Sequence, residues 1–555
     1  MRISPLLWIS ALMFLGIQQV AVAAAPSLNS LFPPGGQVGT HVTVTAQGNF
    51  DPWPVKVWVD RKDVIVRTTS TKGELQFEIP HDATPGTVWI RLYNDQGATS
   101  LYPFFLGRLE EQIEIEPNDS ATASQVIETG SVTINGRLGK AADVDQYTVP
   151  LQTGETMVAS VEANRFLSSP MDAVLQVVSE TGFVLQQNDD YHDRDPQIVF
   201  KAPEDSRYTV RIFSFPSSPN STIGFSGSDR HIYRLTMTTE SFVDHTYPLS
   251  VRHDQPSRVL LFGWNIPQGK EQSMIDPSNP IRSISDARFQ FSPEGMVNPV
   301  ELRTERHETV TEELLFDGIE DESKKGRLSP PVTVTGRIGI ANEHDQYRFR
   351  SKGKQKLSFQ LDSYALGYPL DPILRIKNDD QKILAEVDDT NGGRDAELIF
   401  DVPDEATYTV EVADRFGNGG FRYVYRLTVV PAVPDYRLRV ATDHFELKSK
   451  EALEIPITIE RRHGFSEEIH ISLSESLGGV EVTSGTSLPE GDSSKTVKLI
   501  LKNVGNVVSG TFRIEGRVLR MGSNANARFA EAKLRGAAGY TPLLWLSSLI
   551  ETQSQ

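Results

Sequence analysis

The sequence predicts a multidomain all-β fold, built as a chain of β-sandwiches. Residues 55–59 (Val, Lys, Val, Trp, Val) and 208–212 (Tyr, Thr, Val, Arg, Ile) place an apolar side chain at every second position, as half-buried strands do. Gly, Pro, Asp and Asn separate such runs, and no sustained helical periodicity competes with them. Short strands at regular spacing between turn residues are typical of sandwiches and barrels.

The first 23 residues have the pattern of a secretory signal peptide. Arg2 precedes an apolar run over 6–17, and Ala21 and Ala23 then form an A-x-A cleavage pattern. The run is shorter than the roughly 20 residues that a transmembrane helix needs. We therefore expect removal of 1–23, export to the periplasm or the exterior, and no transmembrane segment.

Composition narrows the classes of protein that this chain can be. The 555 residues include no cysteine, so an exported chain must be stabilised by buried cores or bound ions instead of disulfides. Its 55 basic and 73 acidic residues give a formal net charge of −18. Because so acidic a surface repels phosphate backbones, we expect no nucleic-acid partner.

A duplicated segment is the strongest internal signal in the chain. Residues 132–139 (VTINGRLG) match 332–339 (VTVTGRIG) at an offset of 200. The match continues in order through several pairs, namely Asp145-Gln146-Tyr147 with Asp345-Gln346-Tyr347, Asp189-Asp190 with Asp388-Asp389, Arg194-Asp195 with Arg394-Asp395, and Tyr233-Arg234-Leu235 with Tyr425-Arg426-Leu427. We expect two superposable sandwiches, each large enough to fold around its own core.

The first copy carries further motifs, which are Glu116-Pro117-Asn118-Asp119, Asp143-Val144-Asp145-Gln146-Tyr147, Asp172 and Asn188-Asp189-Asp190. On these residues the module resembles the bacterial pre-peptidase C-terminal (PPC) domain family, a jelly-roll-like β-sandwich usually appended to secreted proteases and other exported proteins. The whole arrangement is similar to exported proteins of planctomycete-type bacteria. The protease domain that such modules accompany has no visible counterpart in this sequence.

Weaker patterns indicate the folds of the remaining segments. The segment containing Gly48-Asn49-Phe50 resembles an IPT/TIG-type immunoglobulin-like fold, and the last β segment resembles a bacterial immunoglobulin-like domain. The predicted boundaries are 1–23 for the signal peptide, 24–107 for the IPT/TIG-like sandwich, 108–240 for the first PPC-like module, 241–305 for a short connecting β region, 306–432 for the second module, 433–537 for the immunoglobulin-like domain and 538–555 for a C-terminal tail.

An acidic run at the start of the first module is the candidate metal site. The oxygen-bearing side chains of the run are Glu114, Glu116, Asn118 and Asp119, and a second group is Asp143 and Asp145. Calcium takes six to eight oxygen ligands, which two such groups facing each other can supply. In collagen-binding members of the family an equivalent run holds calcium against the sandwich, so the resemblance implies that role here. The alternative is a solvated acidic linker with a Pro-Asn-Asp turn.

The second copy departs from this pattern. At the offset of 200, the run 116–119 falls on Phe316-Asp317-Gly318-Ile319, which lacks the Glu and the Asn-Asp pair. Glu320, Asp321 and Glu322 lie nearby and can substitute only after a register shift. We therefore expect the second copy to lack the calcium site.

Other polar and aromatic residues have two readings each. The acidic set shared by the copies is Asp172, Asp189, Asp190 and Asp195 with Asp371, Asp388, Asp389 and Asp395. We interpret it as turn caps, with a cation site as the alternative. The aromatic residues Trp53, Tyr364 and Tyr368 either close the end of a core or stack on a ligand.

Catalytic motifs are incomplete. His307-Glu308 is followed by Thr311 where a zinc-protease helix needs its second His, and residues 224–228 lack the last Gly of a nucleophile elbow. A Ser-His-Asp triad from distant positions stays open, because geometry defines it. We predict no catalytic residues and no enzyme.

The expected function is that of a non-catalytic extracytoplasmic binding or adhesion protein, a string of sandwiches stabilised by calcium. Its loops would meet an extracellular or envelope protein or a polysaccharide. The alternatives are an accessory, substrate-targeting subunit of a secreted hydrolase and a hydrolase with a non-local site.

Overall fold

The computed structural model describes residues 24–218, 224–278, 288–321, 324–390, 392–518, 527–536 and 539–549. These residues form strands almost throughout, and the helices among them are three to five residues long. The predicted all-β, multidomain fold is confirmed. The predicted signal peptide lies outside the described residues. No helix in the described ranges is long and apolar enough to cross a membrane.

The N-terminal unit, residues 24–107, consists of two sheets packed face to face. One sheet has the order β1 (Ser27–Phe32), β3 (His41–Asn49), β6 (Glu74–Glu78), β5 (Ile65–Thr68). The other has the order β2 (Gly35–Gln37), β9 (Tyr102–Gly107), β7 (Gly86–Asn94), β4 (Lys56–Val59), with β8 (Gly97–Ala98) paired to β7. Phe77 and Phe104 stack between the sheets, with ring centroids 4.0 Å apart.

The first module also forms two five-stranded sheets. One has the order β10 (Glu111–Ile113), β12 (Val132–Arg137), β19 (Ile232–Thr238), β14 (Thr156–Glu162), β17 (Gln197–Lys201). The other has the order β11 (Gln125–Val126), β13 (Asp145–Leu151), β18 (Ser206–Pro216), β15 (Met171–Val178), β16 (Val184–Asn188). A single helical turn, α1 (Asn164–Leu167), follows β14.

The second module repeats this strand order without exchange of strands between the copies. One sheet has the order β26 (Glu308–Thr311), β28 (Val332–Arg337), β35 (Val424–Pro431), β30 (Gln355–Asp362), β33 (Ala396–Val402). The other has the order β27 (Arg327–Leu328), β29 (His344–Arg350), β34 (Thr407–Asp414), β31 (Pro372–Lys377), β32 (Ile383–Val387). The short helices are α2 (Glu312–Phe316) and η1 (Tyr364–Leu366).

A glycine in each copy allows two core tyrosines to meet. A Cβ at Gly136 would lie 2.2 Å from Cζ of Tyr233, and a Cβ at Gly336 would lie 2.4 Å from Cζ of Tyr425. The shared glycine of the repeat is therefore a packing requirement, because any larger residue displaces a fully buried ring.

The connecting region and the C-terminal unit complete the chain. The connecting region pairs β20 (Phe242–Tyr247), β22 (Ser257–Trp264), β23 (Gln272–Ile275) and separately β21 (Ser250–Arg252), β25 (Val300–Glu305), β24 (Arg288–Phe291). The C-terminal unit has one sheet in the order β40 (Val480–Thr483), β42 (Thr496–Asn503), β38 (Leu453–Arg462), β36 (Asp435–Val440), β45 (Arg528–Lys533), β44 (Ile514–Arg517), β39 (Ile469–Leu473), β41 (Gly485–Ser487), with β46 (Tyr540–Thr541) paired to β45. Its second sheet has the order β37 (His444–Leu447), β47 (Leu544–Ser548), β43 (Gly510–Phe512), and η2 (Asp492–Ser494) precedes β42.

The expectation of a C-terminal tail over residues 538–555 needs correction. Residues 544–548 form the central strand β47 of the last sheet, and Leu544, Trp545 and Leu546 are buried. The apolar run is therefore part of the last core. It was mistaken for a tail because a five-residue strand has too few positions to show a period.

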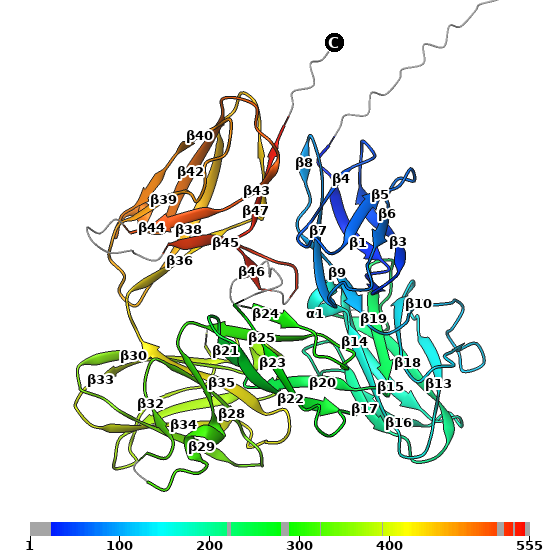
Figure 1. Ribbon diagram of the computed structural model, residues 1–555, viewed down its shortest axis with the longest axis horizontal. Coiled ribbons are helices and arrows are strands. Elements are labelled where there is room, and N and C mark those ends of the chain that lie inside the picture. The colour runs from blue at the N-terminus through cyan, green and yellow to red at the C-terminus, as the bar shows by residue number, and fades with distance from the viewer. Residues whose placement is uncertain are drawn as a thin grey trace, which may run out of the picture.

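The first and last units of the chain contact each other, so the units form a closed arrangement and not an open string. Arg91 of β7 and Asp443, just before β37, form an ion pair at 2.8 Å with side chains 1% and 4% exposed. Trp545 of β47 packs against Tyr93, with ring centroids 4.8 Å apart. Figure 1 shows the blue strands β7 and β8 beside the red strands β43 and β47. The first and last units of the chain are thus neighbours.

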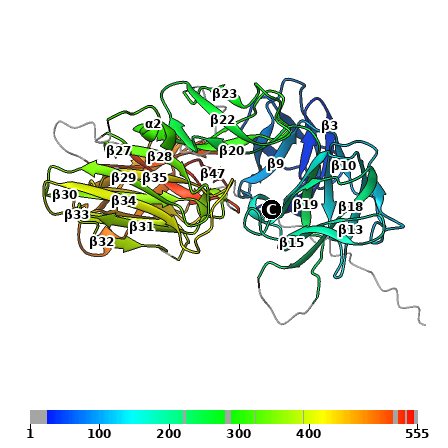
Figure 2. The same ribbon diagram turned by 90° about the horizontal axis from the view of Figure 1, so that it is seen from below.

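The two modules are joined through the connecting region. Arg422 of the second module pairs with the buried Asp244 at 3.0 Å and donates to the carbonyl of Tyr191 in the first module at 3.0 Å. Figure 2 shows the cyan first module and the yellow-green second module on opposite sides of β20 and β22. A buried charge with several partners fixes this joint more precisely than an exposed pair does.

Candidate metal centre

The acidic run enters the first module along the edge of one sheet. β10 pairs in parallel with β12, and the residue after β10 is Glu114. Its Oε2 accepts the backbone N–H of Arg137 at 2.6 Å, which fixes the carboxylate at the end of β12. Asp145 begins β13 of the facing sheet. The site therefore lies where the linker from the N-terminal unit meets both sheets.

Three of the predicted ligands converge. One carboxylate oxygen from each of Glu114, Glu116 and Asp145 lies within 4.8 Å of the other two. Asn118 is fully buried, and a terminal atom of its amide lies 3.1 Å from Oδ1 of Asp145 and 3.3 Å from Oε2 of Glu116. If this atom is nitrogen, it donates to both carboxylates. If it is oxygen, four oxygens face one another and require a cation between them.

The pKa values of the cluster also reflect how close its carboxyl groups lie to one another. Burial raises the pKa of Asp145 to about 9, and the neighbouring Glu114 adds to the effect although Tyr233 donates a hydrogen bond to Asp145. Burial also raises the pKa of Glu114 to about 7, with Glu116 as the main like charge. Carboxyl groups this close cannot all ionise without a positive charge among them.

The other two predicted ligands lie beside this cluster instead of inside it. The Lys140 ammonium lies 3.3 Å from Asp119 and 3.4 Å from Asp143, and so stands between them. Asp143 is 1% exposed on its side chain, whereas Asp119 is 40% exposed. Asp143 still raises the pKa of Asp145, so it belongs to the same electrostatic group.

A tyrosine pair supports the cluster from the core. The hydroxyls of Tyr147 and Tyr233 are 2.6 Å apart, and the Tyr233 hydroxyl donates to Oδ2 of Asp145. The second module has the same relay through Tyr347, Tyr425 and Asp345, with both hydrogen bonds at 2.6 Å. Sequence reasoning did not assign these tyrosines. The signal was present, because Asp-Gln-Tyr and Tyr-Arg-Leu occur in both copies.

The second module retains half of the cluster at a different register. Glu312 accepts the N–H of Arg337 at 3.2 Å, as Glu114 accepts that of Arg137, so the copies align here at an offset of 198. The expected pairing of 116 with Phe316 was therefore two residues out. In the corrected register the counterparts of Glu116 and Asn118 are Leu314 and Phe316.

Phe316 occupies space next to the tyrosine relay of the second module. Its ring centroid lies 6.1 Å from that of Tyr347. Glu320 and Asp321 lie beyond α2, and Asp321 pairs with Lys324 at 3.4 Å, while Glu322 lies outside the described residues. Among the described residues, the grouping of three acidic ligands occurs in the first module and is not repeated in the second.

The donors of the first module fit calcium. The three acidic donors, Glu114, Glu116 and Asp145, all present carboxylate oxygens, which hard cations of this kind prefer. The absence of His and Cys from the cluster disfavours zinc. Bound there, the cation would supply the positive charge that this cluster of carboxylates needs.

The shared acidic residues at 195 and 395 are helix caps. Asp195 accepts the backbone N–H groups of Ala163, Asn164 and Arg165 at 2.7 to 3.2 Å. Asp395 accepts three successive N–H groups, from residues 363–365, at 2.8 Å each. The turn-cap interpretation accounts for this pair, because their oxygens are already bonded to the backbone.

The aromatic candidates lie at packing contacts. The Trp53 indole N–H donates to the carbonyl of Thr69 at 2.9 Å, and its ring contacts the core residue Phe50. Tyr364 donates to Asp193 of the first module at 3.1 Å, and Tyr368 lies against His245. Tyr364 thus joins the second module to the first, and Tyr368 joins it to the connecting region.

One acid-histidine pair resembles part of a catalytic triad. His245 Nδ1 lies 2.7 Å from Oδ2 of the buried Asp244. Its Nε2 is buried and has no hydrogen-bond partner in the part of the chain that is described, and its ring stacks on Phe262 at 5.2 Å. No hydroxyl group of the described residues lies within hydrogen-bond distance of this Nε2, as a triad would require.

No protein-family model matches the chain, and no curated protein matches it. Among solved structures, the pre-peptidase C-terminal domain of a Bacillus anthracis collagenase is 13% identical over 22% of this chain and 100% of its own, with a TM-score of 0.17. The periplasmic lysozyme inhibitor PliG of Aeromonas hydrophila is 14% identical over 23% of this chain and 97% of its own, with a TM-score of 0.16. SGBP-B of a Bacteroides ovatus mixed-linkage glucan utilization locus, solved with a heptasaccharide, is 12% identical over 73% of this chain and 76% of its own, with a TM-score of 0.15. TM-scores this low carry no argument about what this chain binds.

Proposed function

We propose that the chain is a non-catalytic, exported binding protein whose first PPC-like module is stabilised by calcium. The observation that carries the proposal is the convergence of Glu114, Glu116, Asp145 and the buried Asn118 on one point. Burying these groups together costs folding free energy when no cation is present, and a bound cation lowers that cost. The second module has the same fold with half of the group, so the fold itself does not require it.

Calcium at this position would stiffen the joint between the N-terminal unit and the first module. Glu114 and Glu116 belong to the linker, whereas Asp145 belongs to the sandwich. The same linker is already fixed on its other side by Glu111, which forms a buried ion pair with Arg234. A cation would therefore tie the remaining free side of the linker to β13.

A rigid, closed arrangement of sandwiches suits binding rather than turnover. Neighbouring units are held together by buried ion pairs such as Arg91–Asp443 and Arg422–Asp244. The partner class is an extracellular or envelope protein or a polysaccharide.

Thermal unfolding of the whole mature chain, with calcium or with EDTA, tests the proposal. Calcium should raise the unfolding temperature, because a ligand at a hundredfold excess over Kd contributes about 2.7 kcal/mol. Asp145→Asn should remove the shift, and the matched Asp345→Asn in the second module should retain it. An equal response of wild type and D145N to EDTA would contradict the calcium role.

A further inference from the structure

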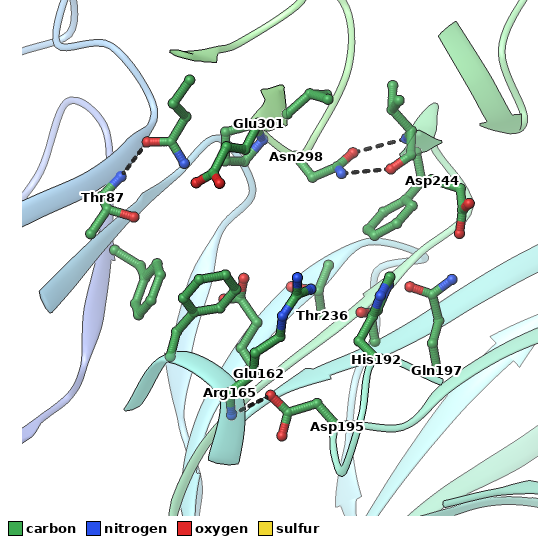
Figure 3. A pocket seen from close by; sticks show the side chains of 18 of the residues that line it. Thr87, Glu162, Arg165, His192, Asp195, Gln197, Thr236, Asp244, Asn298 and Glu301 are labelled. Carbon is green, nitrogen blue, oxygen red and sulfur yellow. Dashed lines mark hydrogen bonds between the residues drawn. The ribbon is translucent and has the colours of Figure 1, made fainter. Parts of the chain in front are cut away.

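A cavity of about 240 Å³ lies where four units of the chain meet (Figure 3). Its lining includes Phe105 of the N-terminal unit, Arg165 of the first module, Arg303 of the connecting region and Tyr368 of the second module. Arg108 and Glu301 are exposed, so the cavity reaches the surface at these residues. None of the acidic cluster residues lines it.

The lining holds five arginines against four carboxylates, which are Glu162, Asp195, Asp244 and Glu301, in a chain that is strongly acidic. Two of its arginines have carboxylate partners, since Arg234 pairs with Glu162 at 3.0 Å and Arg288 pairs with Glu301 at 2.6 Å. The carboxylate of Asp244, which also lines the cavity, pairs with Arg422 behind it. These charges compensate one another without a ligand.

Three further arginines in the lining have no such partner. Arg108 donates to the hydroxyl of Ser292 and Arg165 donates to the carbonyl of Leu366, both neutral acceptors. Arg303 forms no ion pair with any carboxylate in the described ranges. Burial lowers the pKa of the Arg303 guanidinium to about 10, and the neighbouring arginines add to the effect. The cavity therefore has a surplus of cations that an anion would offset.

A buried amide in the lining has unused hydrogen-bonding capacity. Gln197 is 2% exposed, and neither its Oε1 nor its Nε2 has a hydrogen-bond partner among the described residues. The neighbouring hydroxyl of Tyr191 donates its proton to Asp244, so it can meet the Gln197 amide only as an acceptor, which leaves Oε1 of Gln197 without a donor. Figure 3 shows Gln197 beside His192 on one wall of the cavity. Each unpartnered buried group costs about 1 to 3 kcal/mol, so the amide needs a partner inside the cavity.

The remaining wall is largely aromatic. Phe105 and Phe166 line one side with ring centroids 6.3 Å apart, and Tyr368 lines another. His192 adds a neutral ring, because burial and the nearby Arg422 lower its pKa to about 3. The cavity thus offers cations, one free amide and aromatic surface together.

We propose that this cavity, at the junction of four units, binds a small hydroxylated carboxylate of the size of a hexuronic acid. The carboxylate would pair with Arg303 and Arg165, hydroxyl groups would satisfy the amide of Gln197, and the ring would lie against the aromatic wall. Pockets for drug-sized ligands measure about 300 to 1,000 Å³, so this smaller volume fits one sugar unit. The inference rests on the proposed binding function and names its ligand class, but it uses none of the calcium ligands.

Calorimetric titration of the whole mature chain with sodium D-glucuronate tests the inference, with D-glucose and acetate as probes of the separate parts. Glucuronate should bind one per chain, and glucose or acetate should bind at least about tenfold more weakly, a difference of about 1.4 kcal/mol. Equal affinity for glucose and glucuronate would overturn the role of the arginines. No binding of glucuronate at concentrations on the order of 10 mM would overturn the site itself.

Variants identify the cavity as the place of binding. Arg303→Gln and Gln197→Ala should each weaken glucuronate binding about tenfold or more. Arg207→Gln is the matched control, because Arg207 is exposed on β18 outside the cavity and the change in net charge is the same. If R303Q fails to fold, Arg165→Gln takes its place. Wild-type affinity in R303Q and R165Q, or an equal loss in R207Q, would overturn the assignment.

Repeating the titration with EDTA separates this inference from the calcium role. Glucuronate binding that persists in EDTA, together with an unfolding temperature that does not respond to calcium, would remove the calcium role and leave the cavity site. A calcium-dependent unfolding temperature without glucuronate binding would remove only the cavity site.

Discussion

The two modules have the same strand order and the same buried tyrosine relay, but they differ at the entrance of the chain. In the first module Glu116 joins Glu114 and Asp145 in a carboxylate cluster beside the buried Asn118, whereas the second module has Leu314 and Phe316 at the positions of Glu116 and Asn118. The comparison shows that the sandwich folds with either arrangement. The complete cluster is thus an addition to the fold, as expected of a functional site on a shared scaffold.

The largest effect that tests the equivalence of the cores comes from Gly136→Ala and Gly336→Ala. Each Cβ would overlap a buried tyrosine ring, so each substitution should destabilise its own module by about 3 kcal/mol. Hydrogen exchange read by module gives the location of the loss. If one substitution is tolerated while the other is not, the two cores are not equivalent.

A smaller effect is expected from removal of the helix caps. Asp195→Ala and Asp395→Ala each leave three backbone N–H groups without their acceptor, at a cost of about 2 kcal/mol per module. Chemical unfolding of each variant, compared with Asp195→Asn and Asp395→Asn, measures the loss. A cost near zero in either module would mean that its cap is dispensable.

The smallest effect concerns acid stability and should differ between the modules. Burial raises the pKa of Glu411, but hydrogen bonds from Lys377 and Arg375 outweigh this effect and lower the pKa to about 2. His344, also facing this carboxylate at 3.4 Å, adds positive charge at low pH. The group at the matching position of the first module is Arg211, which donates to Gln176.

Because the folded pKa of Glu411 lies below its ordinary value of 4.5, its contribution is complete above that value. It is lost as the pH falls towards 2. Glu411→Gln should therefore cost about 1 kcal/mol at pH 7 and progressively less below pH 4.5. Hydrogen exchange of β34 at pH 7 and pH 3 measures this. A cost that does not change with pH would contradict the role of the charge.

The sequence predicted the all-β fold and the duplication because both depend on local alternation and on repeated residues. It placed Glu114, Glu116 and Asp145 in one candidate site, and the structure brings these three together. It missed Glu312 because the repeat was extended at a constant offset of 200, while the linker of the second copy is two residues out of step. A two-residue difference in length between the copies cannot be detected where the flanking sequences no longer match.

The contacts between units could not be predicted from the sequence. Arg91 and Asp443 are 352 positions apart, and neither lies in a motif. Their pairing depends on how all five units pack, which no local pattern encodes. The cavity at the four-unit junction was missed for the same reason, because its arginines come from separate segments.

The number of calcium ions bound per chain tests the central claim most directly. Calorimetric titration of the whole mature chain with calcium should give one site, which Glu116→Gln abolishes and Glu312→Gln in the second module leaves intact. Two equivalent sites, no site, or a single site that survives E116Q and is lost in E312Q would contradict the account.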